Sequence, residues 1–492
     1  MVTDFFPRMA GVFFAVAFAV QIASSQNDDH YWTHQYGAKG LLLNGAVIAS
    51  TEDETAVFYN PGALGNGEDF GITLSFLSPT YSLLKTDGYL GQGTLAKDSR
   101  LSLSSDLSAV GFRPFKKTPQ LRAAITSFSR YKSGLSLRER EVGGVVNEPS
   151  QIFVGNLEFQ RSVSERWFGA GMAYRFSDNI SIGATQFLTF HSENTSLTIQ
   201  KDIVSRSNPY DLELSWRSKF KYSLSAKASM LTKFGISANW GHVKLGLTFT
   251  TATYHHFIKK ASYDKADMRV YGRDSTVLRA NLAPADLLDY KTPWSIGFGA
   301  DFRIRRTRVS ISTEYFEQIP RYAAIDDLDD PFDGQSTDIK PEHTVVMLGN
   351  SSVFNVGIGL QTRLRNEQSF ITGFRTDFNQ RRIDQQLPTL SFLSTTPSVF
   401  HISCGGLFKL RNNQMSLGLD YAFGRKITTG RLVDLTNITA QNLFGFSETG
   451  GIQSKYRSVV FIFTYDFIIK SWKDWRSRRE ALKRGIQFNG GK

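Results

Sequence analysis

Histidines, carboxylates and hydroxyls that could do chemistry are present in this chain, but they form no familiar catalytic or metal-binding set. His30 and His34 are spaced to share one helical face, and His255 and His256 are adjacent. Neither pair comes with a matching set of Cys or carboxylate ligands. No Ser, His and Asp combination occurs in the setting of a nucleophile elbow. We therefore expect no enzyme, no cofactor and no metal site.

Two acidic runs are the remaining candidates for ionic chemistry. Residues 326–333 contain five aspartates, whose oxygens suit Ca²⁺, although a solvated loop is the simpler interpretation. The second run, 52–54, follows a small apolar stretch and precedes an aromatic step that stops at Asn60-Pro61-Gly62. Because Pro61 fixes φ and Asn60 can bond its own local backbone, the sequence predicts a defined turn there.

The chain ends and the composition indicate an exported all-β protein. Arg8, the apolar run 9–20 and the small residues 23–25 predict a signal peptide over residues 1–25. No later stretch reaches the ~18 consecutive apolar residues of a transmembrane helix. Aromatic residues make up 13% of the chain, with 41 Gly and 14 Pro, which favours strands. The single cysteine, Cys404, excludes an internal disulfide framework and suits a lipid-facing strand position.

The net charge of +12 is concentrated at one end. Residues 468–492 hold eight Lys or Arg against two Asp or Glu, which is half of the net charge. The basicity is therefore largely a property of this tail, and it does not predict nucleic-acid binding.

Many segments alternate between large apolar and small polar side chains with the period of a β-strand. In 294–303, Ile296 and Phe298 fall on one side, and Gly297 and Gly299 on the other. We expect strands at 69–80, 105–114, 120–130, 166–176, 180–191, 220–239, 242–256, 293–304, 308–318, 352–364, 368–379, 398–410, 414–424 and 456–467.

The connections between these strands alternate between short turns and long loops, which is the pattern of outer-membrane barrels. The short connections are 114–119, 177–179, 239–241, 304–307, 364–367 and 411–413. The fold class predicted is all-β, a 14-stranded antiparallel transmembrane β-barrel with both ends periplasmic. Its last strand ends in Tyr465 and Phe467, which resemble the assembly signal of such barrels.

The segment ahead of the strands resembles the outer-membrane long-chain fatty-acid and hydrocarbon transporters, the FadL/TodX type. That family begins with a Gly-rich stretch, an acidic run, an apolar-aromatic step and Asn-Pro-Ala. The matching residues here are Gly37, Gly40 and Gly45, then Glu52-Asp53-Glu54-Thr55-Ala56, Val57-Phe58-Tyr59 and Asn60-Pro61-Gly62-Ala63-Leu64. The resemblance covers 36–467. Gly62 departs from the family's Ala, and glycine loosens the backbone there.

The resemblance implies an N-terminal lumenal hatch over 26–68, a barrel over 69–467 and a basic periplasmic tail over 468–492. A fourteen-stranded barrel leaves a lumen that would leak if nothing closed it. The expected hatch and gating residues are Gly45, Asp53, Phe58, Asn60, Pro61 and Gly62. The alternative is a helix start or an ordinary turn before the first strand.

The resemblance also implies cations for a fatty-acid carboxylate. Alternation along 220–239 and the residues before it places Lys219, Lys221 and Lys227 inward. Lys227, in mid-strand, either pairs with a ligand carboxylate or forms a salt bridge to a lumenal one. A second cationic set, Arg175, Arg303 and Arg363, is expected as a solvated ring at the periplasmic mouth.

The function implied by the resemblance is uptake of long-chain fatty acids or similar hydrophobic molecules across the outer membrane of a Gram-negative bacterium. Outer-membrane lipids would surround the barrel. A scaffold or shuttle subunit of an export or assembly complex is a different interpretation, with protein partners bound by the long loops and the tail 468–492. That tail either lies on the membrane surface or is a disordered extension. A polar porin is disfavoured by the plug.

Overall fold

The computed structural model describes 30–67, 70–75, 78–88, 95–104, 107–115, 117–271, 275–283, 290–325, 346–364, 368–380, 397–410, 413–429, 435, 438–439, 443 and 451–467. The predicted signal peptide, the Asp-rich run 326–333 and the basic tail 468–492 lie outside these residues. No helix among the described residues is long and apolar enough to cross a membrane.

Short helices come first and strands make up nearly all of the rest. The helices are α2 (Gly37–Leu42), α3 (Ala56–Tyr59) and the 3₁₀ helix η1 (Pro61–Asn66). The strands are β1 (Phe70–Ser75), β2 (Ser78–Asp87), β3 (Leu95–Ser104), β4 (Leu107–Phe112), β5 (Leu121–Val145), β6 (Glu148–Arg175), β7 (Ile180–Ser205), β8 (Leu212–Asn239), β9 (Val243–Thr250), β10 (Tyr254–Tyr271), β11 (Ser275–Ala283), β12 (Ser295–Ile304), β13 (Thr307–Phe316), β14 (Ile319–Ile325), β15 (Val346–Asn350), β16 (Val353–Arg363), β17 (Ser369–Asp377), β18 (Val399–Leu410), β19 (Asn413–Thr429) and β20 (Gly451–Phe467).

The strands form one large antiparallel sheet and a small separate one. Neighbours follow the order β1, β4, β5, β6, β7, β8, β9, β12, β13, β16, β17, β18, β19 and β20. Strand β20 also pairs with β2, and with β1 at Ile72 and Phe467. Additional pairings join β2 to β3, and β10 to β8 and β11, while β14 and β15 form the small sheet.

Burial along the strands is the reverse of that in a soluble sandwich. On β12, the apolar side chains Ile296 and Phe298 are 43% and 47% exposed, whereas Ser295 and Asp301 are 3% and 2% exposed. Exposed Ile, Leu, Phe and Tyr side chains recur on β6 to β9 and β16 to β20. The predicted alternation is therefore confirmed, with its apolar face directed outward. Cys404 is exposed on that face beside Ile402, as predicted.

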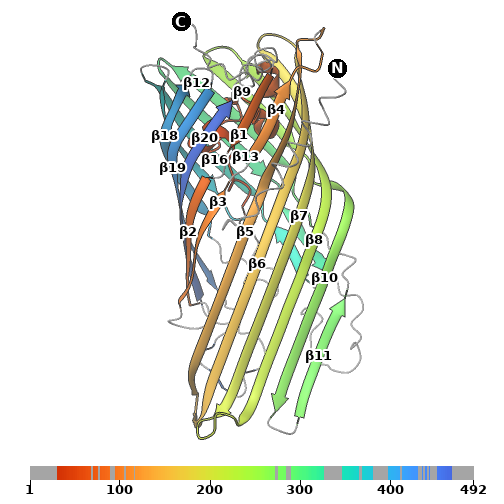
Figure 1. Ribbon diagram of the computed structural model, residues 1–492, viewed down its shortest axis with the longest axis vertical. Helices are drawn as coiled ribbons and strands as arrows, with labels where there is room; N and C mark the ends of the chain where they lie inside the picture. Colours follow the sequence, from red (N-terminus) through yellow and green to blue (C-terminus); the bar gives the residue numbers. More distant parts are fainter. Residues whose placement is uncertain are drawn as a thin grey trace, which may run out of the picture.

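Strands β5 to β8 are far longer than predicted, and together with β10 and β11 they run well past the other strands (Figure 1). They contain 25 to 28 residues, compared with 10 in β12 or β13. A length of ~10 residues spans a bilayer when the strand is tilted. Beyond the level at which Tyr131, Glu165, His191 and Lys227 pair across these strands, residues 131–145, 148–165, 191–205 and 212–227 form what we call the strand extension. Most of its outward side chains are polar, as at Glu158, Gln160 and Asn194, although Val142 is 54% exposed.

The predicted strand count omits elements inside the long connections. Strands β3, β11, β14 and β15 and most of β10 lie where only loops were expected. The predicted first strand, 69–80, is divided between β1 and β2. Two of the predicted short turns occur where expected: the Phe176 N–H bonds the Ile180 carbonyl across one, and the Trp240 N–H bonds the Val243 carbonyl across the other.

Candidate functional site

Residues 30–67, which we call the N-terminal segment, are almost entirely buried and contact strands around the sheet. At the start of the segment, the Trp32 backbone N–H donates to Asp377 on β17 at 3.0 Å. The Trp32 indole donates to Glu314 on β13 at 2.8 Å. Because β13 and β17 are not neighbours in the sheet, one residue bridges separate parts of the wall.

The middle of the segment is held by a buried polar cluster around Asn44. Its amide donates to Ser403 Oγ at 2.9 Å and to the Gly373 carbonyl at 3.2 Å, and its oxygen accepts from Arg375 at 2.6 Å. The next residue, Gly45, has φ of 77°, a conformation that favours glycine. A side chain there would also collide with Gln35. The predicted small residue at position 45 is therefore required by backbone conformation and by space.

The predicted turn at Asn60-Pro61-Gly62 is present and packs against the wall. The Asn60 side chain accepts from the Gly62 N–H and donates to the carbonyls of Ile48 and Ile236, each at 3.0 Å. Pro61 begins η1. A Cβ at Gly62 would lie 2.7 Å from the Gly235 carbonyl oxygen. The departure from the family's Ala therefore has a physical reason, since η1 approaches β8 too closely for a methyl group.

The acidic run makes ionic contacts with two separate groups of strands. Glu54 and Arg122 of β5 form a buried ion pair at 2.5 Å, and Thr73 of β1 donates to the same carboxylate at 2.9 Å. Glu52 contacts Lys39, Lys244 of β9 and Arg308 of β13 at 2.6, 2.7 and 3.2 Å.

The three acids of this run differ in exposure and in bonding partners, and the pKa values of Glu52 and Asp53 shift in opposite directions. The side chain of Glu52 is 45% exposed, and the ammonium of Lys39, then that of Lys244, holds its pKa well below the usual 4.5. Asp53 accepts from the Thr55 N–H and hydroxyl, while burial raises its pKa. Asp53 therefore stabilises the local turn before α3, whereas Glu52 and Glu54 are the acids of this run that bind the wall.

Phe58 lies in a cluster of aromatic rings on one side of the segment. Its ring packs edge-on against Tyr36 and Phe128 at centroid distances of 5.0 and 5.1 Å. Trp167 and Phe187 continue the cluster. Beside it is a cavity of about 770 Å³, part of it open to solvent, lined by Phe58, Trp167, Leu231 and others. We call this the aromatic pocket.

Two cationic side chains line the aromatic pocket and lie over the Phe58 ring. The Arg130 guanidinium lies 5.5 Å from the centre of the Phe58 ring, and the Lys233 ammonium lies 5.3 Å from it. Arg130 also donates to the Tyr31 carbonyl. Lys233 is 3.9 Å from a Glu314 oxygen, a long separation that leaves its ammonium able to contact a ligand.

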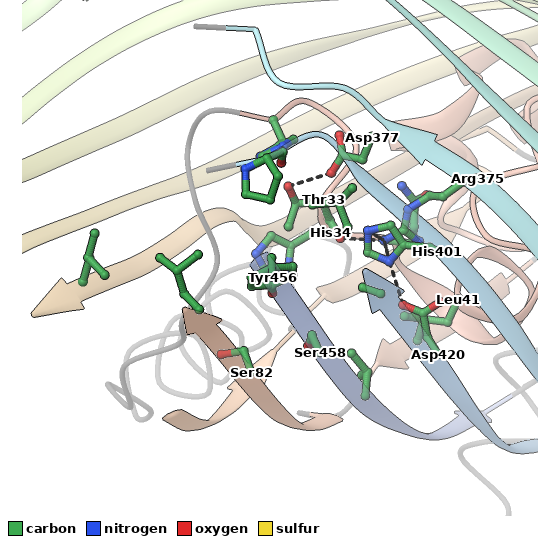
Figure 2. Close-up of a pocket in the computed structure, with 18 of the residues that line it drawn as sticks. Thr33, His34, Leu41, Ser82, Arg375, Asp377, His401, Asp420, Tyr456 and Ser458 are labelled. Atoms are coloured by element: carbon green, nitrogen blue, oxygen red, sulfur yellow. Dashed lines mark hydrogen bonds and ion pairs between the residues drawn. The ribbon is translucent and has the colours of Figure 1, made fainter. Parts of the chain in front are cut away.

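A second cavity, the polar pocket, encloses about 950 Å³, part of it open to solvent. Its walls come from β2, β3, β5 and β17 to β20 and from the N-terminal segment (Figure 2). His401 contacts Asp420 at 2.9 Å and Arg375 at 3.0 Å. His34 and Gln35 line both pockets, so this part of the N-terminal segment is a partition between them.

The predicted inward lysines are separated by an irregularity in β8. The pairing register between β7 and β8 shifts between His191 and Glu193, so that Lys227 pairs with His191 while Lys221 pairs with Ser196. Lys219 and Lys221 are exposed, so their predicted inward direction is wrong. The cause is the extra residue of a bulge, which reverses the alternation beyond it. The side chain of Lys227 lies outside the described part of the chain.

Other predicted residues lie apart from the pockets. Arg303 and Arg363 are exposed at short turns, and Arg175 is half-buried. Tyr465 and Phe467 lie on β20, with side chains outside the described part. His30 and His34 share no helix, because residues 30–36 are not helical. Among the described residues, no group of three or more His, Cys, Asp or Glu is arranged to hold a metal ion.

Sequence reasoning missed the charged and titratable residues of the two pockets: Arg130, Glu165, Lys233 and Glu314 in one, and Asp98, Arg375, Asp377, His401 and Asp420 in the other. The alternation of side chains along β8 could have identified Lys233, which shares the inward face of that strand with Leu231. Arg130 is harder to find. The register between β5 and β6 shifts there, and both Arg130 and its neighbour Tyr131 are buried.

Comparison with known proteins rests on structure. No protein-family model matches the chain, and no curated protein matches it. The Pseudomonas putida toluene transporter TodX superposes with a TM-score of 0.53 at 13% identity, over 89% of this chain and 99% of that one. A Pseudomonas aeruginosa FadL homologue gives 0.54 at 11% identity, with the same coverage. The chain has the fold of the FadL and TodX proteins. A TodX variant described as a monoaromatic hydrocarbon channel also matches, with a TM-score of 0.53, 14% identity and coverage of 89% and 100%.

Proposed function

We propose that this protein is an outer-membrane channel of a Gram-negative bacterium for hydrophobic small molecules, long-chain fatty acids among them. In this proposal the N-terminal segment is a hatch in the lumen of a fourteen-stranded barrel. The observation that carries it is the burial of residues 30–67, with hydrogen bonds to strands as far apart as β5, β8, β13 and β17. The proteins of similar fold are named as transporters and channels, and we assign no enzymatic activity.

The strand pairings support a closed barrel. The order of neighbours from β1 through β4 to β20 contains fourteen strands and returns to β1 at Ile72 and Phe467. The outward apolar side chains support contact with lipid, because an exposed apolar surface of this extent is costly in water. The glycines at 299 and 357 support close packing of a hatch. A Cβ at either position would approach the backbone of Ala49 or Asn44 to 2.7 or 2.9 Å.

The aromatic pocket supports a hydrophobic ligand. Phe58, Phe128 and Trp167 offer apolar ring faces and edges, and burying a ligand against them is favourable in proportion to the apolar area removed from water. Lys233 and Arg130 supply positive charge for a carboxylate at the end of that ligand, and they balance the two carboxylates that also line the pocket, Glu165 and Glu314. We propose that ligands enter from the side of the long connections, rest in this pocket and leave when the hatch shifts.

The test combines uptake with conductance. A host strain that lacks its own fatty-acid transporter should gain uptake of labelled toluene and palmitate when it makes this protein. In planar bilayers, the intact protein should show no sustained ion conductance, whereas a variant that lacks residues 30–67 should conduct. Uptake no greater than in the empty strain would contradict the proposal. Sustained conductance of the intact protein would instead favour a polar porin.

A scaffold role is the second candidate, and the strand extension is the observation that favours it. Most of its outward side chains, among them Glu158 and Asn194, are polar, so this part of the wall presents a surface to water and to proteins. Purification of the protein from its own membrane would decide between the two roles. A stoichiometric protein partner bound to the extension, with no transport, would support the scaffold.

A further inference from the structure

A row of polar side chains crosses five neighbouring strands of the polar pocket. Arg375 of β17 pairs with His401 of β18, and Asp420 of β19 contacts that histidine. Ser458 of β20 pairs with Ser82 of β2. All five line the cavity and are buried, and Figure 2 shows Arg375, His401 and Asp420 grouped against the N-terminal segment.

Three atoms of this row have unused hydrogen-bonding capacity. Arg375 Nε, Asp420 Oδ1 and Ser458 Oγ are buried and make no hydrogen bond within 3.5 Å to the described residues, although the Asn44 amide lies near the Asp420 carboxylate and the Tyr456 hydroxyl lies near Ser458. The three side chains are 3%, 5% and 2% exposed. Buried polar groups in proteins are nearly always hydrogen-bonded. A donor, a charged acceptor and a hydroxyl with this unused capacity along one wall therefore point to a ligand that both donates and accepts.

The charge of the pocket selects against an anion. Asp377 and Asp420 face a single buried guanidinium, Arg375. The third carboxylate, Asp98, is already paired with Arg100 at 3.0 Å. A ligand carboxylate would bring a further negative charge near the first two, and like charges in a buried site repel strongly. A neutral group would avoid this repulsion.

The remaining lining of the pocket is apolar. Leu41 of the N-terminal segment, Leu84, Val399 and Val460 contribute to it. A ligand that fills the cavity therefore needs an apolar body as well as a polar end. This combination separates it from sugars, which lack the apolar body, and from pure hydrocarbons, which would leave the polar row without partners.

We propose that the polar pocket is a second binding site, for the hydroxyl end of an uncharged amphiphile such as a long-chain alcohol. The hydroxyl would donate to Asp420 and accept from both Arg375 and Ser458, while the chain lies against the leucine and valine side chains. The inference rests on the proposed channel function and specifies a substrate class for it. It assigns the two pockets different ligands: the aromatic pocket accepts a carboxylate beside Lys233, and the polar pocket accepts an alcohol.

The test measures equilibrium binding of three labelled probes, 1-dodecanol, dodecanoate and dodecane, to the full-length protein in lipid nanodiscs. The Ser82→Ala/Ser458→Ala double variant changes only small side chains of the row. We expect it to bind dodecanol about fivefold to tenfold more weakly, as expected for lost hydrogen bonds, with unchanged dodecanoate and dodecane binding. Asp420→Asn, which keeps the shape but removes the charge, should weaken dodecanol binding and strengthen dodecanoate binding.

Ser237→Ala is the matched control, because Ser237 is a buried serine on β8 that lines neither pocket. It should leave all three affinities unchanged. Equal effects of the double variant and this control would overturn the inference, as would unchanged dodecanol binding in both polar-row variants. In those cases dodecane binding and uptake would persist, and the channel proposal would stand. If none of the probes binds the wild-type protein, both proposals fail.

Discussion

The two pockets share a partition but differ in their opposite walls. His34 and Gln35 line both. The aromatic pocket is completed by Phe58 and by wall residues such as Trp167 and Leu231, and the polar pocket by Arg375, His401 and Asp420. His34 and Gln35 thus face a pocket lined by aromatic rings on one side and a pocket lined by buried polar groups on the other. In the proposed channel, the charged groups that distinguish the pockets come from the strands of the wall, while the N-terminal segment separates the pockets and adds Phe58 to the aromatic one.

The largest expected effect comes from loosening the N-terminal segment, which should damage both pockets together. Glu54→Leu removes one partner of a buried pair and leaves the Arg122 charge unpaired. Such a loss costs about 3–5 kcal/mol. The measurement is urea unfolding of the reconstituted protein. Glu52→Gln is the control, because an exposed ion pair contributes about 0–1 kcal/mol. Similar losses in the two variants would contradict the difference in burial.

The next effect should separate the pockets. Phe58→Ala removes the central ring of the aromatic pocket, and we expect toluene affinity to fall about 10- to 100-fold, as expected for ~1.5–3 kcal/mol of lost apolar contact. Dodecanol binding in the polar pocket should change little. Competition binding with labelled toluene measures this. Phe298→Ala, on the outward face, is the control; equal losses from both variants would indicate a general effect on folding.

A smaller effect should distinguish ligands within the aromatic pocket. Lys233→Met keeps the apolar stem and removes the charge, so dodecanoate affinity should fall about tenfold, the lower end of what one lost charged hydrogen bond costs (~1.5 kcal/mol). Toluene affinity should stay the same. Lys219→Met is the matched control, since that lysine is exposed. A loss of dodecanoate binding in the control alone would return the ligand role to the lysines predicted from sequence.

The smallest effect is a pH dependence of the contact at Glu52. Because Lys39 and Lys244 hold the pKa of Glu52 below 4.5, its stabilisation is complete above about pH 4.5 and is lost as the pH falls through the lowered value. Proteolysis of the N-terminal segment should therefore be constant from pH 7 to 5 and increase below about pH 4. In Glu52→Gln this acid-dependent increase should be smaller. An increase already present between pH 6 and 5 would contradict this account.

Sequence patterns predicted the wall better than the pockets. Alternation gave the correct outward face for Ile296 and Phe298 because β12 has a regular register along its length. The same rule failed for Lys219 and Lys221 because a bulge in β8 lies between them and Lys227. Glu54 could be seen as part of an acidic run, but its partner Arg122 is distant in sequence. Only the folded arrangement brings the two together.

In the proposed channel, the N-terminal segment is a gate that must move before a ligand passes. A disulfide between Leu43→Cys and Gly359→Cys, in a Cys404→Ala background, would fix the segment to β16. A Cβ at Gly359 would lie 3.0 Å from the Leu43 Cβ, closer than the ~3.8 Å mean of disulfides, so the bond requires a small shift of the segment away from β16. The measurement is toluene uptake before and after reduction. We predict that uptake is blocked in the oxidised protein, returns on reduction and persists in each single-cysteine variant. Undiminished uptake in the fully oxidised protein would contradict the account.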